Sequence, residues 1–135
     1  MKASWQAKRE HQNMALIVIA EDELLIAEVL KIMLEDAGHQ VEAAAHGVAA
    51  LELVVQKRPD LVLTDFMMPL MTGLELAQNI RADPALADIP IILMSGAQAS
   101  IGRAHPEAFN AVLEKPYNEA RLLSAIEQAI KAQTT

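Results

Sequence analysis

The stretch LVLTDFMMP, which runs from Leu61 to Pro69, decides the fold that this chain is expected to adopt. Its first three residues are a short apolar run, which is typical of a strand buried on both faces at the centre of a parallel sheet. Asp65 stands at the carboxyl end of this strand, where ligands bind in open α/β sheets. A carboxylate in that position is a metal ligand, a base or a nucleophile. The alternative interpretation is that Asp65 only starts the turn before Pro69.

Short apolar runs and helical patterns alternate along the rest of the chain. We expect strands at residues 15–20, 40–45, 61–63, 89–94 and 111–113, with Phe109 as an alternative start of the last one. We expect helices from residue 24 to a glycine cap at Gly38, then at 47–56, 73–81 and 97–104, and after an N-cap at Asn118. This alternation predicts a doubly wound α/β domain with five parallel strands and five helices. Right-handed crossovers then place the carboxyl ends of all strands at one edge of the sheet.

The composition narrows the class of protein. The chain has 135 residues, 53% of them hydrophobic, and no cysteine, which fits one domain with a single core and agrees with a reducing compartment. Lys and Arg number 11 against 18 Asp and Glu, and the net charge of −7 argues against binding to a nucleic-acid backbone. No apolar run approaches the roughly 18 residues that a membrane span requires. We therefore expect a cytoplasmic protein that neither enters a membrane nor binds DNA directly.

The first 13 residues, MKASWQAKREHQN, are mixed and polar. Basic residues are present among them, but no apolar segment of signal-peptide length follows. We expect residues 1–13 to be an extension ahead of a domain at residues 14–135. An alternative is that Trp5 anchors a partner or a second copy of the chain.

Charged and polar side chains stand at the ends of four of the expected strands. Glu21 and Asp22 follow the first strand, Asp65 ends the third, Ser95 follows the fourth and Lys115 follows the fifth. Capping of the next helix is an ordinary explanation for an acid such as Asp22, but it explains Glu21 less well because Glu21 still belongs to the strand end. Because all these ends meet at one edge, we expect the five side chains to lie together.

Three clustered carboxylates repel one another and call for a cation. Oxygen ligands that leave positions open to water and phosphate suit Mg²⁺. An ion beside Asp65 would make its carboxylate a usable nucleophile for a phosphoryl group. Lys115 would supply positive charge to the phosphoryl oxygens, and the Ser95 hydroxyl would hydrogen-bond the new group. Positioning and charge neutralisation of this kind are what phosphoryl transfer needs from a protein.

These motifs resemble those of bacterial two-component response regulator receiver domains, in particular the single-domain, chemotaxis-regulator type. The resemblance covers about residues 15–132 and rests on five landmarks in order, which are Glu21-Asp22, Asp65, Pro69 with Gly73, Ser95-Gly96-Ala97 and Lys115-Pro116. It implies a flavodoxin-like fold with strand order 2-1-3-4-5 and a cis bond between Lys115 and Pro116.

The resemblance also implies a role for each site residue. Asp65 would be the phosphoacceptor. Asp22 would bind Mg²⁺ directly, Glu21 would act through water, and Met67 would lend its backbone carbonyl. Ser95 would be the switch hydroxyl and Lys115 the phosphate-binding cation. The only reactions of its own would be Mg²⁺-dependent self-phosphorylation and self-dephosphorylation.

Two departures from the family pattern bear on signalling. The family often has an aromatic residue three positions before the lysine, where this chain has Val112. Coupling is therefore expected to pass through the loop after Ser95 and the weakly specified helix that follows it. Met67 and Ala97 carry no polar group that could orient a hydrolytic water, so we expect slow loss of the phosphoryl group.

The expected partners are proteins. The family resemblance implies a histidine kinase or a histidine phosphotransfer protein as the phosphoryl donor, a separate protein as the output target, and a monomer or a weak phosphorylation-dependent dimer. The first helix is predicted from the helical spacing of apolar residues, which are Leu24, Leu25, Val29, Ile32 and Met33. Leu24, Leu25 and Ile26 are consecutive and cannot all reach the core, so one or two either form a docking patch for the donor or are incidentally exposed.

Three other functions would use a similar fold. A phosphatase that uses an aspartyl-phosphate would place a general acid at the position of Met67. A nucleotide- or flavin-binding module would have a glycine-rich loop after the first strand, where this chain has EDELL. A receiver-like scaffold that is never phosphorylated would not need the complete set of acid, hydroxyl and lysine.

Overall fold

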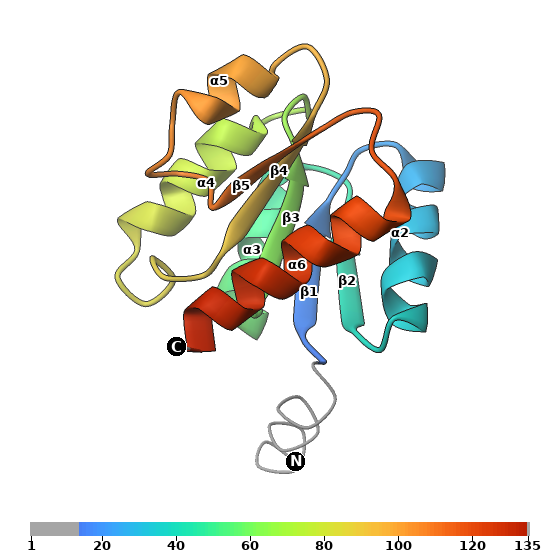
Figure 1. Ribbon diagram of the computed structural model, residues 1–135. Coiled ribbons are helices and arrows are strands. Elements are labelled where there is room, and N and C mark those ends of the chain that lie inside the picture. The colour runs from blue at the N-terminus through green and yellow to red at the C-terminus, as the bar shows by residue number, and fades with distance from the viewer. Residues whose placement is uncertain (1–13, 135) are drawn as a thin grey trace.

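The computed structural model describes residues 14–134, and the predictions for residues 1–13, including that for Trp5, lie outside the described part (Figure 1). Strands and helices alternate along it. The strands are β1 (Leu16–Ala20), β2 (Gln40–Ala44), β3 (Leu61–Asp65), β4 (Ile91–Ser95) and β5 (Ala111–Glu114). The helices are α2 (Leu24–Asp36), α3 (Gly47–Lys57), α4 (Gly73–Ala82), α5 (Ala99–Arg103) and α6 (Glu119–Thr134).

The five strands form one parallel sheet in the order β2-β1-β3-β4-β5. The most buried strands, β1, β3 and β4, lie in the middle of this order, and every residue of β4 is buried. In register, Val18 of β1 faces Val62 of β3, and Leu63 of β3 faces Ile92 of β4. The predicted doubly wound, flavodoxin-like fold with strand order 2-1-3-4-5 is confirmed.

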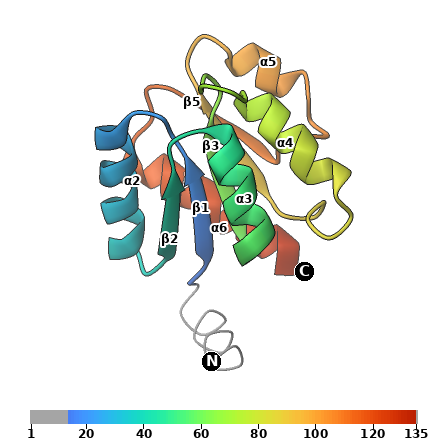
Figure 2. The same cartoon turned by 180° about the vertical axis from the view of Figure 1, so that it is seen from behind.

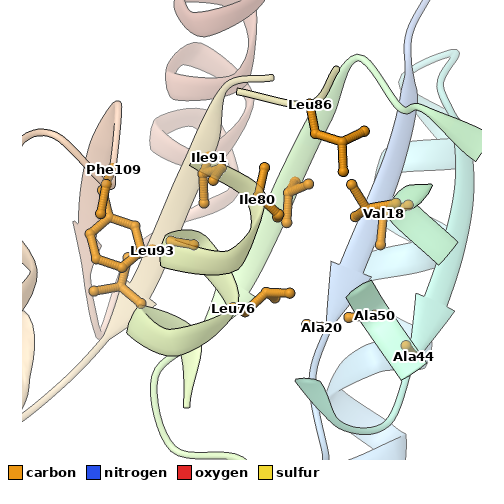
Figure 3. Packing of buried hydrophobic residues seen from close by; sticks show 14 of the residues in the cluster. Val18, Ala20, Ala44, Ala50, Leu76, Ile80, Leu86, Ile91, Leu93 and Phe109 are labelled. Atoms are coloured by element: carbon orange, nitrogen blue, oxygen red, sulfur yellow. The ribbon is translucent and has the colours of Figure 1, made fainter. Parts of the chain in front are cut away.

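Helices cover both faces of the sheet and enclose two apolar clusters. Helices α2 and α6 lie on one face, and α3 and α4 lie on the other (Figures 1 and 2). Alternate residues of one strand serve the two sides, so Val18 belongs to the α3/α4 cluster while Ile17 and Ile19 belong to the α2/α6 cluster. Figure 3 shows the α3/α4 cluster, in which Leu76 and Ile80 of α4 pack among strand side chains.

Local sequence signals define several helix ends. After α2, Gly38 has a φ of 100°, and its N–H donates to the carbonyl of Glu35 while the N–H of His39 donates to that of Leu34. These two bonds are the Schellman arrangement, which confirms the predicted glycine cap. Asn118 caps α6 as expected, because its side chain accepts the N–H of Arg121 at 2.8 Å.

Some boundaries and faces differ from the predictions. Strand β4 begins at Ile91 and not at residue 89, since Pro90 has no N–H to give the ladder and contributes only its carbonyl, to the N–H of Val62. The structure starts β5 at Ala111, so the alternative start at Phe109 is wrong. The apolar repeat that predicted α2 mostly marks its exposed face, because the residues buried by this helix are Ala27, Leu30 and Leu34.

No helix within residues 14–134 is both long enough and apolar enough to cross a membrane.

Candidate functional site

Three carboxylates meet at the carboxyl edge of the sheet. Glu21 directly follows β1 and its N–H donates to the carbonyl of Ala44, so it continues the β1–β2 ladder. Asp22 is the next residue and is exposed, and Asp65 is the last residue of β3. One carboxylate oxygen from each of the three lies within 4.8 Å of the others. The predicted convergence of these acids is therefore present in the structure.

Glu21 is the most confined of the three acids, with a relative exposure of 1%. Its Oε2 accepts the N–H of Glu23 at 3.0 Å, whereas its Oε1 is buried and has no hydrogen-bond partner. Burial raises the pKa of Glu21, and the negative charges of Asp65 and Asp22 raise it further. The hydrogen bond from the N–H of Glu23 and the positive charge of Lys115 act in the opposite direction but do not outweigh the burial. A buried carboxylate oxygen without a partner is costly unless a cation completes its coordination.

The acids at the start of α2 have a possible ordinary role, which is to cap the helix. Glu23 occupies the N-cap position, but its side chain makes no capping hydrogen bond. The carboxylate of Glu21 accepts the N–H of Glu23, so Glu21 ties down the start of the helix from inside the site. Capping by the Glu23 side chain therefore does not occur.

Lys115 contacts the acid of the central strand. Its Nζ donates to Oδ1 of Asp65 at 3.1 Å, and the side chains are 34% and 15% exposed respectively. Burial alone would lower the pKa of Lys115, but the hydrogen bond from Lys115 and the charges of Asp65 and Glu21 outweigh it and the pKa is raised. The peptide bond between Lys115 and Pro116 is cis, as the resemblance implied.

Ser95 ends β4 and is almost fully buried, at 1% exposure. Its carbonyl accepts the N–H of Lys115 at 2.9 Å, which fixes the two residues side by side at the strand ends. Its hydroxyl donates to Oε1 of Gln98 at 3.4 Å. Sequence reasoning did not single out Gln98, since a residue three positions into a loop carries no signal until the loop is folded.

Two further residues contact the backbone carbonyl of Asp65, and the sequence did not predict this role for them. The hydroxyl of Thr64, which is fully buried, donates to the backbone carbonyl of Asp65 at 2.9 Å. Gly73 starts α4 against the same carbonyl, and a Cβ added at Gly73 would lie 2.2 Å from that oxygen. Gly73 was recognised as a landmark, but only the structure shows that no other side chain fits there.

The loop after Asp65 presents apolar side chains and a strained turn. Met67 is 59% exposed and Leu70 is 79% exposed. Leu70 has a φ of 72°, and the N–H of Met71 donates across it to the carbonyl of Pro69 at 2.8 Å. Such a three-residue turn with positive φ is rare and strained, and strain of this kind concentrates at functional sites.

The two positions assigned to coupling lie in the loop after β4 and on β5. Ala97 is exposed in the loop between β4 and α5. Val112 is half-buried on β5 and packs against the α3/α4 cluster. A Cβ added at Gly102 of α5 would lie 3.0 Å from Cγ2 of Val112, so the helix sits close against this side chain.

The arrangement has the chemistry of a cation and phosphate site. Three carboxylates at the ends of β1 and β3 supply hard oxygen ligands, and the unpartnered Oε1 of Glu21 is an oxygen that a cation could coordinate. Lys115 supplies a positive charge directly to the Asp65 carboxylate. Asp65 thus contacts a lysine and also belongs to the group of three acids that could hold a metal ion.

Strand order and site together define a class of protein, the flavodoxin-like α/β domains with an acidic site at the carboxyl edge of the sheet. A family model described as the response regulator receiver domain matches residues 17–127, and the chain belongs to this family. It is therefore a receiver domain of two-component phosphorelay signalling and not an enzyme in the usual sense, in contrast to the phosphatase and nucleotide-binding alternatives.

Individual relatives agree with this assignment. The chain is 29% identical over 120 residues to the DNA-binding dual master transcriptional regulator RpaA of Synechocystis, covering 87% of this chain and 50% of that protein. It is 29% identical over 116 residues to the polar-differentiation response regulator DivK of Brucella anthropi, covering 82% and 92%. The chain spans about half the length of the first curated relatives that it matches.

A solved structure bears on the metal. The chain is similar to the receiver domain of a sensor histidine kinase from Pseudomonas aeruginosa, which contains a magnesium ion coordinated in its active-site cleft. The two share 26% sequence identity with a TM-score of 0.80, over 87% of this chain and 98% of that one.

Proposed function

We propose that this domain accepts a phosphoryl group on Asp65 from a phosphohistidine of a histidine kinase or a histidine phosphotransfer protein. The observation that carries the proposal is the position of the Asp65 carboxylate, which lies within 4.8 Å of two other carboxylates and 3.1 Å from Lys115. A carboxylate oxygen would form the new bond to phosphorus while the bond from phosphorus to the donor imidazole breaks. Lys115 would then pair with a phosphoryl oxygen.

We propose Mg²⁺ as the cofactor, with Asp22 and Asp65 as direct ligands, Glu21 acting through water, and the Met67 backbone carbonyl as a further ligand. When bound, the ion screens the acids from the incoming phosphate. The buried Oε1 of Glu21 supports this, as does the magnesium ion in the similar Pseudomonas receiver. Glu21 also fixes the start of α2 through the N–H of Glu23, and so holds the loop that carries Asp22.

The exposed apolar side of α2 is our proposed docking surface for the phosphoryl donor. Leu24 and Leu25 are 77% and 81% exposed at the start of the helix, next to the acids. A groove beside them is lined by Leu25, Ile26, Val29, Leu30, Met33 and Tyr117. Contiguous exposed apolar surface of this kind is a feature of protein–protein interaction sites. The adjacent position of the groove and the acidic site suits a helical donor that presents its phosphohistidine to Asp65.

We further propose that phosphorylation acts on a separate output protein, as in the chemotaxis-type regulators that the sequence resembles. The charge of about −2 on the phosphoryl group would draw the Ser95 hydroxyl toward it. Because Ser95 begins the loop that leads to α5, its movement would alter the surface formed by α5, β5 and α6. The target, a cytoplasmic location and a monomer or weak dimer remain predictions.

The test is exposure to a small phosphodonor with Mg²⁺, followed by intact-protein mass spectrometry. Wild type should gain the mass of one phosphoryl group, and acid or hydroxylamine treatment should remove it. Asp65→Ala should gain none, while Asp60→Ala, which changes an acid at the opposite end of β3, should gain it like wild type. An unmodified wild-type protein would instead favour a receiver-like scaffold that is never phosphorylated.

A further inference from the structure

The hydroxyl of Ser95 has a protein partner in the present structure. It donates to Oε1 of Gln98, with an oxygen–oxygen distance of 3.4 Å. This distance is at the long end for a hydrogen bond between two oxygens, so the bond is weak. Ser95 is 1% exposed, and a buried hydroxyl needs a partner. Gln98 meets that need without holding the hydroxyl tightly.

Gln98 occupies a position from which it can affect α5. It is the N-cap residue of this helix, and its backbone carbonyl accepts the N–H groups of Ile101 and Gly102 at 3.0 and 3.3 Å. Its side chain makes no capping bond to the helix and turns to Ser95 instead. The intervening Gly96 and Ala97 have no polar side chains. The link from the switch hydroxyl to the helix therefore runs through Gln98.

The body of α5 is held against the sheet by close packing and by an ion pair between Arg103 and Glu114. A Cβ added at Gly102 would lie 2.5 Å from Cδ2 of Leu93 and 3.0 Å from Cγ2 of Val112. Val112 occupies the position that is often aromatic in this family, so the rotamer change that such a ring would undergo is not available. At its first turn, α5 is linked to the side chain of Ser95 through Gln98.

We propose that Gln98 is a positioning residue of the phosphoryl switch, which holds the Ser95 hydroxyl in the unphosphorylated state and frees the first turn of α5 when that hydroxyl turns to the phosphoryl group. The inference rests on the proposed function of Asp65. A hydroxyl has one proton to donate, so Ser95 cannot donate fully to Gln98 and to a phosphoryl oxygen at once. The two bonds compete, and the state of Asp65 determines which one forms.

The test measures binding of beryllofluoride, a phosphoryl mimic, in the presence of Mg²⁺, by isothermal titration calorimetry on the full chain. Gln98→Leu removes the competing acceptor at similar size, so its affinity should rise about two- to fivefold above that of wild type, the range expected for a weak neutral hydrogen bond. In a Ser95→Ala background the same substitution should have no effect. Gln128→Leu, on the exposed side of α6, is the matched control and should bind like wild type.

A second readout follows the helix itself. The backbone amide shifts of residues 99–103 in Gln98→Leu without ligand should move part of the way toward those of beryllofluoride-bound wild type. An affinity equal to wild type, or a change of the same size in the Ser95→Ala background, would overturn the role of Gln98. A wild-type protein that neither binds beryllofluoride nor becomes phosphorylated would overturn the proposed function as well, which separates the two failures.

Discussion

At the scale of single residues, His39 shows how one hydrogen bond makes stability depend on pH. Its Nδ1 accepts the N–H of Ala15 at 3.1 Å, and a ring nitrogen that accepts carries no proton. Burial lowers the pKa of His39 below its ordinary value of 6.5, and the nearby charge of Asp60 opposes this only in part. The unfolded chain therefore binds a proton more readily than the folded chain. The contribution of His39 to stability is present above pH 6.5 and is lost as the pH falls through the lowered pKa.

For His39 we predict that its removal changes how steeply the free energy of unfolding depends on pH. Between pH 8 and pH 5 the free energy of unfolding should fall more for wild type than for His39→Gln, because glutamine does not titrate. Urea unfolding followed by circular dichroism at several pH values measures both curves. Because the other histidines and most carboxylates are the same in both proteins, the difference reports His39 together with its interaction with Asp60. Parallel curves would show that folding does not lower the pKa of His39.

Met67 leads to a prediction about the lifetime of the phosphoryl group. Its side chain is 59% exposed two residues after Asp65 and offers only a thioether. Ala97, two residues after Ser95, is exposed and offers no polar group either. An attacking water would lack a side chain to orient it, and orientation contributes much of the rate of such reactions. Met67→Asn should therefore shorten the lifetime severalfold.

The lifetime is measured by the decay of the phosphorylated mass after removal of the donor, in Mg²⁺ buffer. Met67→Leu, which is also apolar, should keep the wild-type lifetime. If Met67→Asn decays no faster than either protein, the missing polar group is not what limits hydrolysis.

At the scale of elements, the sequence predicted where strands lie better than which side of a helix faces the core. The runs at β1 and β3 are apolar on both faces, so composition alone marks their first residues within about one position, although β3 continues two residues beyond the predicted end at Leu63. In α2, apolar residues occur on more than one side, and Leu25 is exposed while Leu30 is buried. Periodicity identifies such a helix but cannot orient it when apolar residues also occupy its outer face.

The site was predictable to the extent that the sheet edge defines it. Strand ends brought Glu21, Asp65 and Lys115 together because parallel strands share an edge. Contacts that depend on how loops fold over that edge were not predictable. The Ser95–Gln98 bond is one case, since nothing in the spacing of these residues indicates it.

The junction of β3 and α4 yields a prediction from a matched pair of glycines. A Cβ at Gly73 would lie 2.2 Å from the carbonyl oxygen of Asp65 and 3.2 Å from Cα of Phe66, both backbone atoms with little room to yield. A Cβ at Gly96 would meet nothing within 4 Å. Gly73→Ala should thus lower the free energy of unfolding by about 3 kcal/mol or more. Gly96→Ala should change it by less than about 0.5 kcal/mol.

Urea unfolding of the two variants beside wild type measures this difference. Because the strain in Gly73→Ala falls on the backbone of Asp65, uptake of the phosphoryl group should also be slower in whatever fraction remains folded. Equal stability of the two variants would mean that α4 can move away from β3 at little cost.

At the scale of the whole molecule, the acidic site exists only when the chain is folded. Asp22 and Asp65 are separated along the chain by α2, β2 and α3, and the pairing of β1 with β3 brings them to the same edge. The unfolded chain has the same acids but not the cluster. The site therefore concentrates negative charge at a cost to the fold, and that cost is offset when a cation binds. Metal binding and folding are linked for this reason.

This linkage gives a prediction for Mg²⁺ and Asp22. A ligand that binds only the folded state raises the free energy of unfolding, by about 1.4 kcal/mol when its concentration is ten times the dissociation constant. Wild type should show this rise in urea unfolding when EDTA is replaced by Mg²⁺. Asp22→Asn should be no less stable than wild type in EDTA, because one of three like charges is gone, and should lose most of the gain with Mg²⁺. Glu52→Gln, at an exposed acid on α3, should keep the full gain. If Asp22→Asn responded to Mg²⁺ as strongly as wild type, the ion would be binding elsewhere, and the acids at the sheet edge would have to be neutralised by Lys115 alone.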